Sequence, residues 1–334
     1  MNRKLIVLAL AGICISGANA NANANANELT HFVEMDEKAT FIEGENVVQV
    51  PAAEAYFQPR EYSIAEKAAA MSAVAVSADG TQYKAEISEE TLALLESAVK
   101  TMQAQGLDAS IFTTEPHEPT KPVLPDDTFS TLKVIGADNR VRVTNTTSAP
   151  HSYNGRIDVG CTGTLITKKH VLTAGHCVSN GSGTWYKSLN FTAGQNGSYK
   201  PWGTATWKNA VTTTAWHNNG DTNYDYAIIV LNSEPNGGNS GWGTYSGGTH
   251  SVTGYPGDKP FGTMWTDSGS TDAISSRRVC YTLDTAGGQS GSGIKDSNNY
   301  VRGVHTTGSS TRNCGTQITS TVYNTLKDWI AKNP

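Results

Sequence analysis

A serine, a histidine and an aspartate, the residue types of a serine nucleophile, its base and the supporting carboxylate, occur in three separate segments of the 334-residue chain. Ser290 lies in the glycine-rich stretch DTAGGQSGSG at 284–293, a composition typical of a tight loop whose backbone N–H groups converge on one oxygen. His176 follows a short apolar run, and Asp225 stands at the start of a β-branched one. A serine hydroxyl becomes a nucleophile when a base removes its proton, and the imidazolium then formed is stabilised by a buried carboxylate. The three segments therefore indicate nucleophilic catalysis.

The order of these residues along the chain distinguishes two folds that share this chemistry. The nucleophile elbow of an α/β-hydrolase reads Gly-x-Ser-x-Gly, and its histidine comes last; here Ser292 stands at the last glycine position and the histidine comes first. Asp225 lies 49 residues after His176, and Ser290 lies another 65 residues on, which suits loops of a double β-barrel. Asp221, four residues before Asp225, is the alternative acid.

The N-terminus has the form of a secretory signal. Basic residues precede a short apolar run that ends at Ile13 and is too short to span a bilayer. Residues 1–20 are the expected signal peptide, although an Asn-Ala repeat allows cleavage as late as residue 26. No later stretch approaches about 18 apolar residues, so we expect a secreted, extracellular protein without a membrane partner.

Four of the five cysteines remain after the signal, an even set that predicts disulfides in an exported protein. Three pairings are possible; Cys161 with Cys177 and Cys280 with Cys314 is favoured, because each bridge would then stay within one barrel. The sequence contains no C-x-x-C and no H-E-x-x-H, so neither a metal nor another cofactor is expected.

Charge divides the chain into two unlike parts. Residues 1–133 hold 9 Lys and Arg against 19 Asp and Glu, whereas residues 134–334 hold 16 against 11. The excess of five positive charges in the second part contains no basic runs, so it does not indicate nucleic-acid binding. The expected partners are protein or peptide substrates, and the expected state is a monomer.

Local patterns predict helices in the first part and strands in the second. Residues 61–76 and 88–105 have helical spacing, and 113–127 reads as a proline-rich, extended linker. From residue 134 short β-branched runs alternate with turns, which predicts two β-barrels divided near residue 235. The predicted strands are 140–143, 163–167, 169–173, 226–231, 251–255 and 300–305. Ser320 is expected to cap a final helix at 321–332 that packs on the second barrel.

Six motifs in this order resemble bacterial secreted glutamyl endopeptidases of the chymotrypsin superfamily. They are VIGADNR from 134, CTGTLI from 161, TAGHC from 173, NYDY from 223, GYPGDK from 254 and GGQSGS from 287. The resemblance covers about 134–310 and implies an all-β, chymotrypsin-like double β-barrel with a C-terminal helix, preceded by a partly helical pro-segment at 21–133. It implies Ser290 as nucleophile, His176 as base and then acid, and Asp225 as the orienting carboxylate. The N–H groups of Gly288 and Ser290 would form the oxyanion hole.

The same resemblance implies a pocket for a substrate carboxylate. Cleavage after Lys133 would expose the amine of Val134 at this pocket, and Thr285 and His305 match its other positions, the histidine with a charge-assisted bond. In trypsin-like proteases an aspartate directly before the serine pairs with the new N-terminus; here that position is Gln289, so no such ion pair can form. The domain boundaries that follow are 1–20, 21–133 and 134–334.

Glutamate is distributed in a way that supports the same specificity. Residues 1–133 contain fourteen glutamates, whereas residues 134–334 contain only Glu234, with ten aspartates. A protease that cuts after glutamate would spare such a mature body and readily clear such a pro-segment. Two alternatives stay open: a trypsin-like or broad-specificity protease in which Asp284 lies in the pocket, and an inactive homologue that acts as a binding or toxin module.

Overall fold

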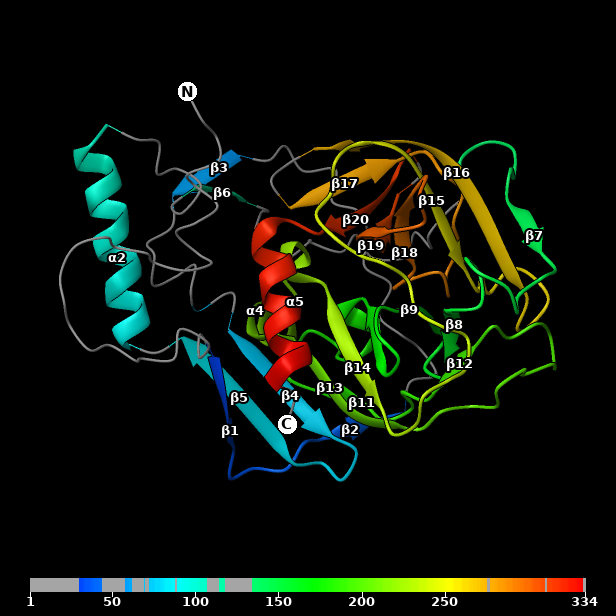
Figure 1. Ribbon diagram of the computed structural model, residues 1–334, viewed down its shortest axis with the longest axis horizontal. Coiled ribbons are helices and arrows are strands. Elements are labelled where there is room, and N and C mark those ends of the chain that lie inside the picture. The colour runs from blue at the N-terminus through cyan, green and yellow to red at the C-terminus, as the bar shows by residue number, and fades with distance from the viewer. Residues whose placement is uncertain are drawn as a thin grey trace, which may run out of the picture.

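In the computed structural model a sheet of orange and red strands lies above a sheet of green strands, and each belongs to one barrel (Figure 1). The structure describes residues 30–43, 58–61, 69, 72–87, 89–106, 114–117, 134–274, 277–309 and 311–332. The expected signal peptide and Lys133, the residue before the expected cut, lie outside the described residues.

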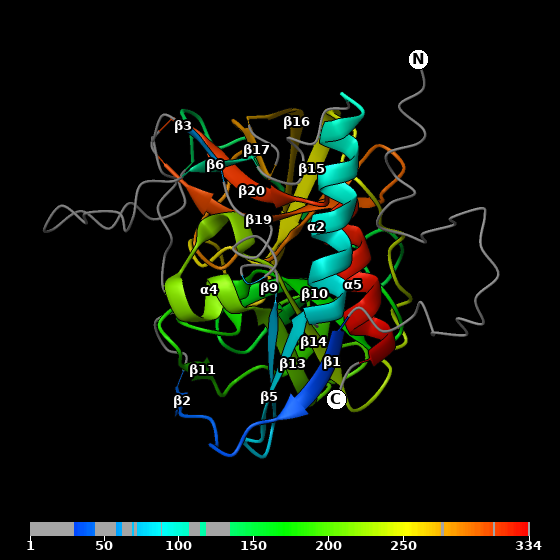
Figure 2. The same ribbon diagram turned by 90° about the vertical axis from the view of Figure 1, so that its left-hand side faces the viewer.

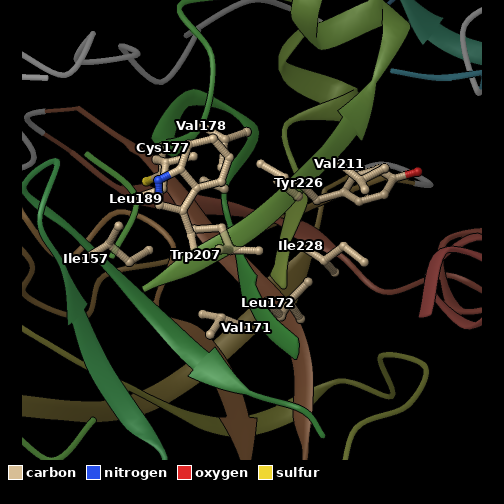
Figure 3. Close-up of a cluster of buried hydrophobic side chains, with 14 of the residues drawn as sticks. Ile157, Val171, Leu172, Cys177, Val178, Leu189, Trp207, Val211, Tyr226 and Ile228 are labelled. Carbon is tan, nitrogen blue, oxygen red and sulfur yellow. The ribbon is translucent and has the colours of Figure 1, made fainter. Parts of the chain in front are cut away.

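The first sheet contains nine antiparallel strands in the order β1-β5-β4-β13-β14-β10-β9-β8-β12. The six from the second part of the chain are β8 (Asn154–Ile157), β9 (Cys161–Leu165), β10 (His170–Thr173), β12 (Phe191–Ala193), β13 (Trp207–Thr213) and β14 (Ala227–Leu231). Both faces of β14 are buried, as its unbroken apolar sequence AIIVL requires. Side chains from β10, β13 and β14, including Leu172, Val211 and Ile228, meet in one apolar core (Figure 3).

The second sheet has the order β15-β18-β19-β20-β17-β16-β7, and a further pairing of β15 with β16 closes six of these strands into a barrel. The strands are β7 (Val141–Val143), β15 (Gly248–Gly254), β16 (Met264–Ala273), β17 (Arg278–Tyr281), β18 (Gly293–Asp296), β19 (Val301–Gly308) and β20 (Asn313–Gln317). Each of the six strands predicted from sequence overlaps an observed strand. The chymotrypsin-like double β-barrel is therefore confirmed.

The C-terminal helix α5 (Ser320–Lys332) forms as expected, but it is capped and packed differently. The Thr319 hydroxyl accepts a hydrogen bond from the Val322 N–H (3.1 Å), so Thr319, one residue before Ser320, caps the helix. Trp329 is buried and stacks on Tyr226, just before β14, with ring centroids 5.4 Å apart. The expectation that α5 packs on the second barrel was incomplete, because this aromatic pair joins the helix to the first barrel, in a buried cluster that also contains Val301 and Val304 of the second.

Of the two helices predicted in the expected pro-segment, one forms as predicted and the other only in part. Residues 89–104 form α2 (Glu89–Ala104), which stands at the far left of Figure 1. The helix predicted at 61–76 was wrong at both ends, since Glu61 ends β3 (Gln58–Glu61) and 73–77 forms β4 (Ala73–Ser77), whereas Ala69 between them is helical. Pairing of β4 with β13 overrides the helix propensity of its alanines.

The other strands described before residue 134 are β1 (Thr30–Glu34), β2 (Phe41–Ile42), β5 (Gln82–Ile87) and β6 (Thr114–His117). β6 begins the predicted linker and pairs with β3, and residues 118–127 of that linker lie outside the described part. Within the described chain, no helix has the length and apolar character needed to cross a bilayer.

Candidate active site

Strand pairing brings His176 and Asp225 to the same end of two neighbouring strands in the first sheet. Thr173, the last residue of β10, lies opposite Ala227, the first residue of β14. His176 follows in a short 3-10 turn, η2 (Gly175–Cys177), and Asp225 directly precedes the strand-like run. In an antiparallel pair, the end of one strand lies beside the start of the other, so two side chains 49 residues apart in sequence become neighbours.

Both oxygens of the Asp225 carboxylate bind His176. One accepts from His176 Nδ1 at 2.7 Å, and the other accepts from the His176 backbone N–H at 2.9 Å. Because a carboxylate only accepts, Nδ1 carries the ring proton of the neutral imidazole and Nε2 presents its lone pair. Nε2 is buried and has no hydrogen-bond partner among the described residues. Asp221, the alternative acid, instead caps the 3-10 turn η3 (Thr222–Tyr224) by accepting from the Asn223 N–H (3.0 Å).

The loop that carries Ser290 packs against the strand that leads into His176. The Ser290 carbonyl accepts from the Thr162 N–H, and the Gly291 N–H donates to the His305 carbonyl, each at 2.8 Å. Gly291 has φ of 85°, and a Cβ there would overlap the Thr173 hydroxyl. Only glycine fits this approach, which places Ser290 beside the turn that holds His176. Ser290 itself is 2% exposed.

The expected oxyanion-hole donors, the N–H groups of Gly288 and Ser290, lie in a tightly constrained part of the loop. Gly288 has φ of 96°, and its carbonyl is held by the Thr162 hydroxyl at 2.7 Å. A Cβ on Gly288 would lie 2.5 Å from the Tyr255 carbonyl, so a side chain there would displace the loop. The N–H groups of Gly288 and Ser290 make no hydrogen bond to any described residue. They are thus available to a ligand, and Thr162, which the sequence analysis noted only as part of the CTGTLI motif, positions the loop.

Thr285 and His305 each present a buried polar atom that lacks a partner within the described chain, Thr285 Oγ1 and His305 Nε2. On the other side of the His305 ring, Nδ1 lies 2.6 Å from Tyr281 Oη. Burial raises the pKa of Tyr281, so its phenol stays protonated. In the tautomer in which this phenol donates to Nδ1, Nε2 of the neutral ring carries the hydrogen and is a donor.

The charge state of His305 differs from the expectation of a charge-assisted bond. Burial, together with the charges of His176 and Arg278, lowers the pKa of His305 to about 3. The ring is therefore neutral at physiological pH, and it can bind a carboxylate as a neutral N–H donor.

Asp284 does not lie in a pocket as a trypsin-like acid would. Its two carboxylate oxygens accept from the backbone N–H groups of Ile135 and Asn139, each at 2.7 Å, and its side chain is buried. Val134, the residue expected to supply a new amine, directly precedes Ile135 and is half-buried. Asp284 thereby holds residues 135–139 beside Thr285.

A buried arginine completes this attachment, and sequence reasoning missed it. Arg140 forms ion pairs with Asp138 (2.9 Å) and Asp258 (2.5 Å), and the first of these contacts holds the pKa of Asp138 well below its usual range. The Arg140 guanidinium also lies 3.4 Å from the side-chain oxygen of Gln289, the residue before the nucleophile. The Gln289 side chain thus accepts a hydrogen bond from Arg140, an internal cation, at the position where a trypsin-like aspartate pairs with an N-terminal amine. In the sequence, Arg140 was visible only as the last residue of the VIGADNR motif, with nothing to indicate these contacts.

The other side of the nucleophile loop borders a cavity of about 180 Å³. It is lined by Gly288, the disulfide cysteine Cys161, Tyr255, Lys259 and Phe261 among others, and Phe261 is 70% exposed.

The structure has both bridges of the favoured cysteine pairing. Cys161–Cys177 ties β9 to the turn of His176, and Cys280–Cys314 joins residues directly opposite in β17 and β20. The sulfurs of Cys161 and Cys177 lie within 4.8 Å of a His176 nitrogen. Because these sulfurs are bonded to each other, this group offers no thiolate and does not fit a metal ion.

Comparison with known proteins gives consistent relatives. The trypsin family's sequence model matches residues 138–330. A glutamyl endopeptidase of Bacillus licheniformis is 37% identical over 225 residues, which cover 60% of this chain and 70% of the relative. A protein of Bacillus subtilis named extracellular metalloprotease is 36% identical over 223 residues, 60% of this chain and 71% of the relative. The site described above has no donor set that matches that second name.

A solved structure, a Glu endopeptidase in complex with MPD, superposes with a TM-score of 0.56 at 33% identity and covers 60% of this chain and 100% of its own. The matched region contains both barrels, His176, Asp225 and Ser290. The chain belongs to the trypsin family of chymotrypsin-like serine endopeptidases.

Proposed function

We propose that this protein is a secreted serine endopeptidase that cuts peptide bonds after glutamate through His176, Asp225 and Ser290. The observation that carries the reaction is the two-point contact of Asp225 with His176, which leaves Nε2 unprotonated and without a partner in the described chain. The observation that carries the specificity is the pair of unpartnered polar atoms on Thr285 and His305.

The reaction proceeds through an acyl-enzyme. His176 Nε2 takes the proton of the Ser290 hydroxyl while Oγ forms a bond to the substrate carbonyl carbon. The carbonyl oxygen gains the negative charge and accepts hydrogen bonds from the N–H groups of Gly288 and Ser290, each contributing about 3–4 kcal/mol to the transition state. The imidazolium, stabilised by Asp225, donates its proton to the departing amine as the C–N bond breaks. Water then attacks the ester by the same steps.

Three neutral or cationic groups recognise the glutamate carboxylate. The Thr285 hydroxyl and the His305 Nε2–H each donate one hydrogen bond, and the Val134 amine supplies the positive charge. An α-amine has a pKa of about 7.7–8.0, so it is largely protonated at neutral pH. Asp284 supports this role because it holds Ile135, the next residue, by its backbone. Glutamine, which lacks the charge, should be cut far more slowly.

The amine of Val134 exists only after the bond to Lys133 is cut, so we infer that residues 21–133 form a pro-segment and that the full chain is a zymogen. The fourteen glutamates of residues 1–133 and the single Glu234 after them support this reading. A second candidate, trypsin-like specificity, loses its proposed acid because Asp284 is bonded to the chain segment at 135–139.

Mapping cleavage sites in a digest of mixed proteins tests the specificity. We expect cuts after glutamate, few after aspartate and none after lysine, and no activity in Ser290→Ala. Cuts after lysine or arginine would support the trypsin-like alternative. A wild-type enzyme without peptidase activity would indicate the binding or toxin module.

A further inference from the structure

The pro-segment is joined to the first barrel by strand pairing. β4 lies along one edge of β13, with Ser77 opposite Asn209 at one end and Ala73 opposite Thr213 at the other. Two hydrogen bonds lengthen this seam: the Ala78 N–H donates to the Lys208 carbonyl (2.9 Å), and the Thr214 N–H donates to the Ser72 carbonyl (2.7 Å). The other edge of β13 is occupied by β14. Without the pro-segment, this stretch of β13 is an open sheet edge that can accept an extended strand.

Side chains of the added strand are part of the barrel's core. Ala73 and Ala75 are 1% exposed and Val76 is fully buried, in the same apolar cluster as Ala210 and Val211 of β13. Burial of this extent is typical of a folded interface and is absent from a loosely attached tether. Figure 1 shows β4 beside the green strands β13 and β14, and Figure 2 shows β5 and β1 continuing outward from the same sheet.

Two tryptophans of the protease domain are also covered by the pro-segment. The Trp185 indole N–H donates to the Gln82 side-chain oxygen at 3.0 Å, and β2 pairs with β11 (Trp185–Tyr186). Phe41 meets Trp207 edge to face, with centroids 6.1 Å apart. Trp185 is fully buried and Trp207 is 6% exposed. These indoles would report the departure of the pro-segment.

One end of the β4–β13 pairing contacts helix α4, which packs against His176. Ser72 Oγ donates to Thr214 Oγ1 (2.7 Å), the first residue of helix α4 (Thr214–Asn219), and Thr213 caps that helix by accepting from the Trp216 N–H (3.0 Å). The Trp216 ring contacts the His176 ring with centroids 6.0 Å apart. The docked strand therefore supports the helix that packs on His176.

Glutamates are distributed unevenly around the docked hairpin formed by β4 and β5. Residues 67–85 contain none, whereas Glu34, Glu37 and Glu43 are exposed in the described part of the pro-segment. An enzyme that cuts after glutamate, as proposed above, would cut around this hairpin before cutting within it.

From these contacts we infer that the edge of β13, with Trp185 and Trp207 beside it, is a docking site for the β4–β5 hairpin. The pro-segment stays bound there as a non-covalent partner after the bond between residues 133 and 134 is cut. At micromolar concentration it stays bound until it is digested, so activation has a cutting step and a separate release step.

The test uses the full chain with Ser290→Ala, in which a recognition site for a sequence-specific protease replaces residues 128–133. After cutting at that site, native mass spectrometry and size-exclusion chromatography at micromolar concentration should show both pieces together. Dilution should release the pro-segment with a red shift of tryptophan emission. Separation of the two pieces at micromolar concentration would overturn the inference. This arm is independent of glutamate specificity, because the inactive variant is cut by another enzyme.

Two matched variants locate the binding site. Val76→Asp places a charge in the fully buried seam and should raise the dissociation constant by roughly 30-fold or more. Val33→Asp makes the same change at a residue that is 53% exposed on β1 and should leave binding unchanged. Equal effects of the two variants would contradict docking through β4. If Val76→Asp does not fold, the milder Gln82→Ala, which removes the acceptor of Trp185, replaces it and should weaken binding measurably.

A time course of the wild-type enzyme follows the release step. Peptides that begin at Lys67 and end at or shortly after Glu86 should be the last part of the pro-segment to disappear. If they vanish first while the cut Ser290→Ala complex remains intact, docking holds and the proposed glutamate specificity is wrong.

Discussion

Replacing Asp284 by asparagine tests the assignment of this buried carboxylate most directly. Both oxygens accept backbone N–H groups at 2.7 Å, from Ile135 and Asn139. Asparagine has nearly the same shape but only one acceptor, and its NH₂ group would face a backbone donor. Loss of one charge-assisted bond costs about 1.5–3 kcal/mol, and the N–H left unpaired costs about 1–3 kcal/mol more. We expect a combined loss of about 3–5 kcal/mol.

This loss should act on the attachment of residues 134–139 and therefore on substrate recognition. A change of about 3–5 kcal/mol corresponds to a factor of roughly 10²–10⁴ in the attached population. The assay compares kcat/KM of the processed variant and wild type on peptides that differ only in Glu, Gln or Lys before the cut, together with urea midpoints. We expect the preference for Glu over Gln to fall strongly, with KM rising and no gain or loss of lysyl cleavage.

Asp272→Asn is the matched control, because Asp272 is exposed on β16 and should tolerate the same change. The reasoning would be refuted if the wild type cut lysyl peptides and Asp284→Asn abolished only that activity. Asp284 would then be a specificity acid. An unchanged urea midpoint and an unchanged Glu preference would equally show that its two hydrogen bonds do not hold the segment.

Three further predictions concern single side chains. His305→Gln should reduce the loss of stability in acid, measured by urea midpoints at pH 7 and pH 4: the pKa of His305 is about 3 when folded and about 6.5 when unfolded, so in wild type stability falls as pH drops through this interval. Lys295→Met should stabilise the fold by about 1–4 kcal/mol below pH 7, because burial lowers the pKa of Lys295 to about 7. The gain in stability should shrink as pH rises toward about 10.5, where the unfolded lysine also loses its charge. Equal gains in the urea midpoint at pH 6 and pH 10 would contradict this. Asn239→Glu, in the exposed loop at 232–240, should create a self-cleavage site seen by mass spectrometry, whereas Asn239→Gln should remain intact.

Local pattern was sufficient for most strand positions and for part of the pro-segment. β-branched runs between glycine-rich turns mark strands because their signal lies within a few residues, and α2 was readable from its apolar spacing and from Gly106, which follows it with φ of 68°. The stretch at 73–77 was misread as helix, because its strand partner lies more than 130 residues away along the chain. Short apolar segments are ambiguous until their partner is known. The same limit applied to α5, whose apolar face was predicted but whose packing on the first barrel was not.

For the candidate active site too, the sequence determined some features and the tertiary structure decided others. Residue type and order alone determined the candidates His176, Asp225 and Ser290 and the chemistry they could perform, because that chemistry depends on functional groups that the sequence states directly. Only the tertiary structure decided that Asp225 and not Asp221 contacts His176, that Asp284 binds backbone, and that His305 is neutral. These properties depend on the direction of a side chain and on its burial, and both arise from contacts between segments that are distant in the chain.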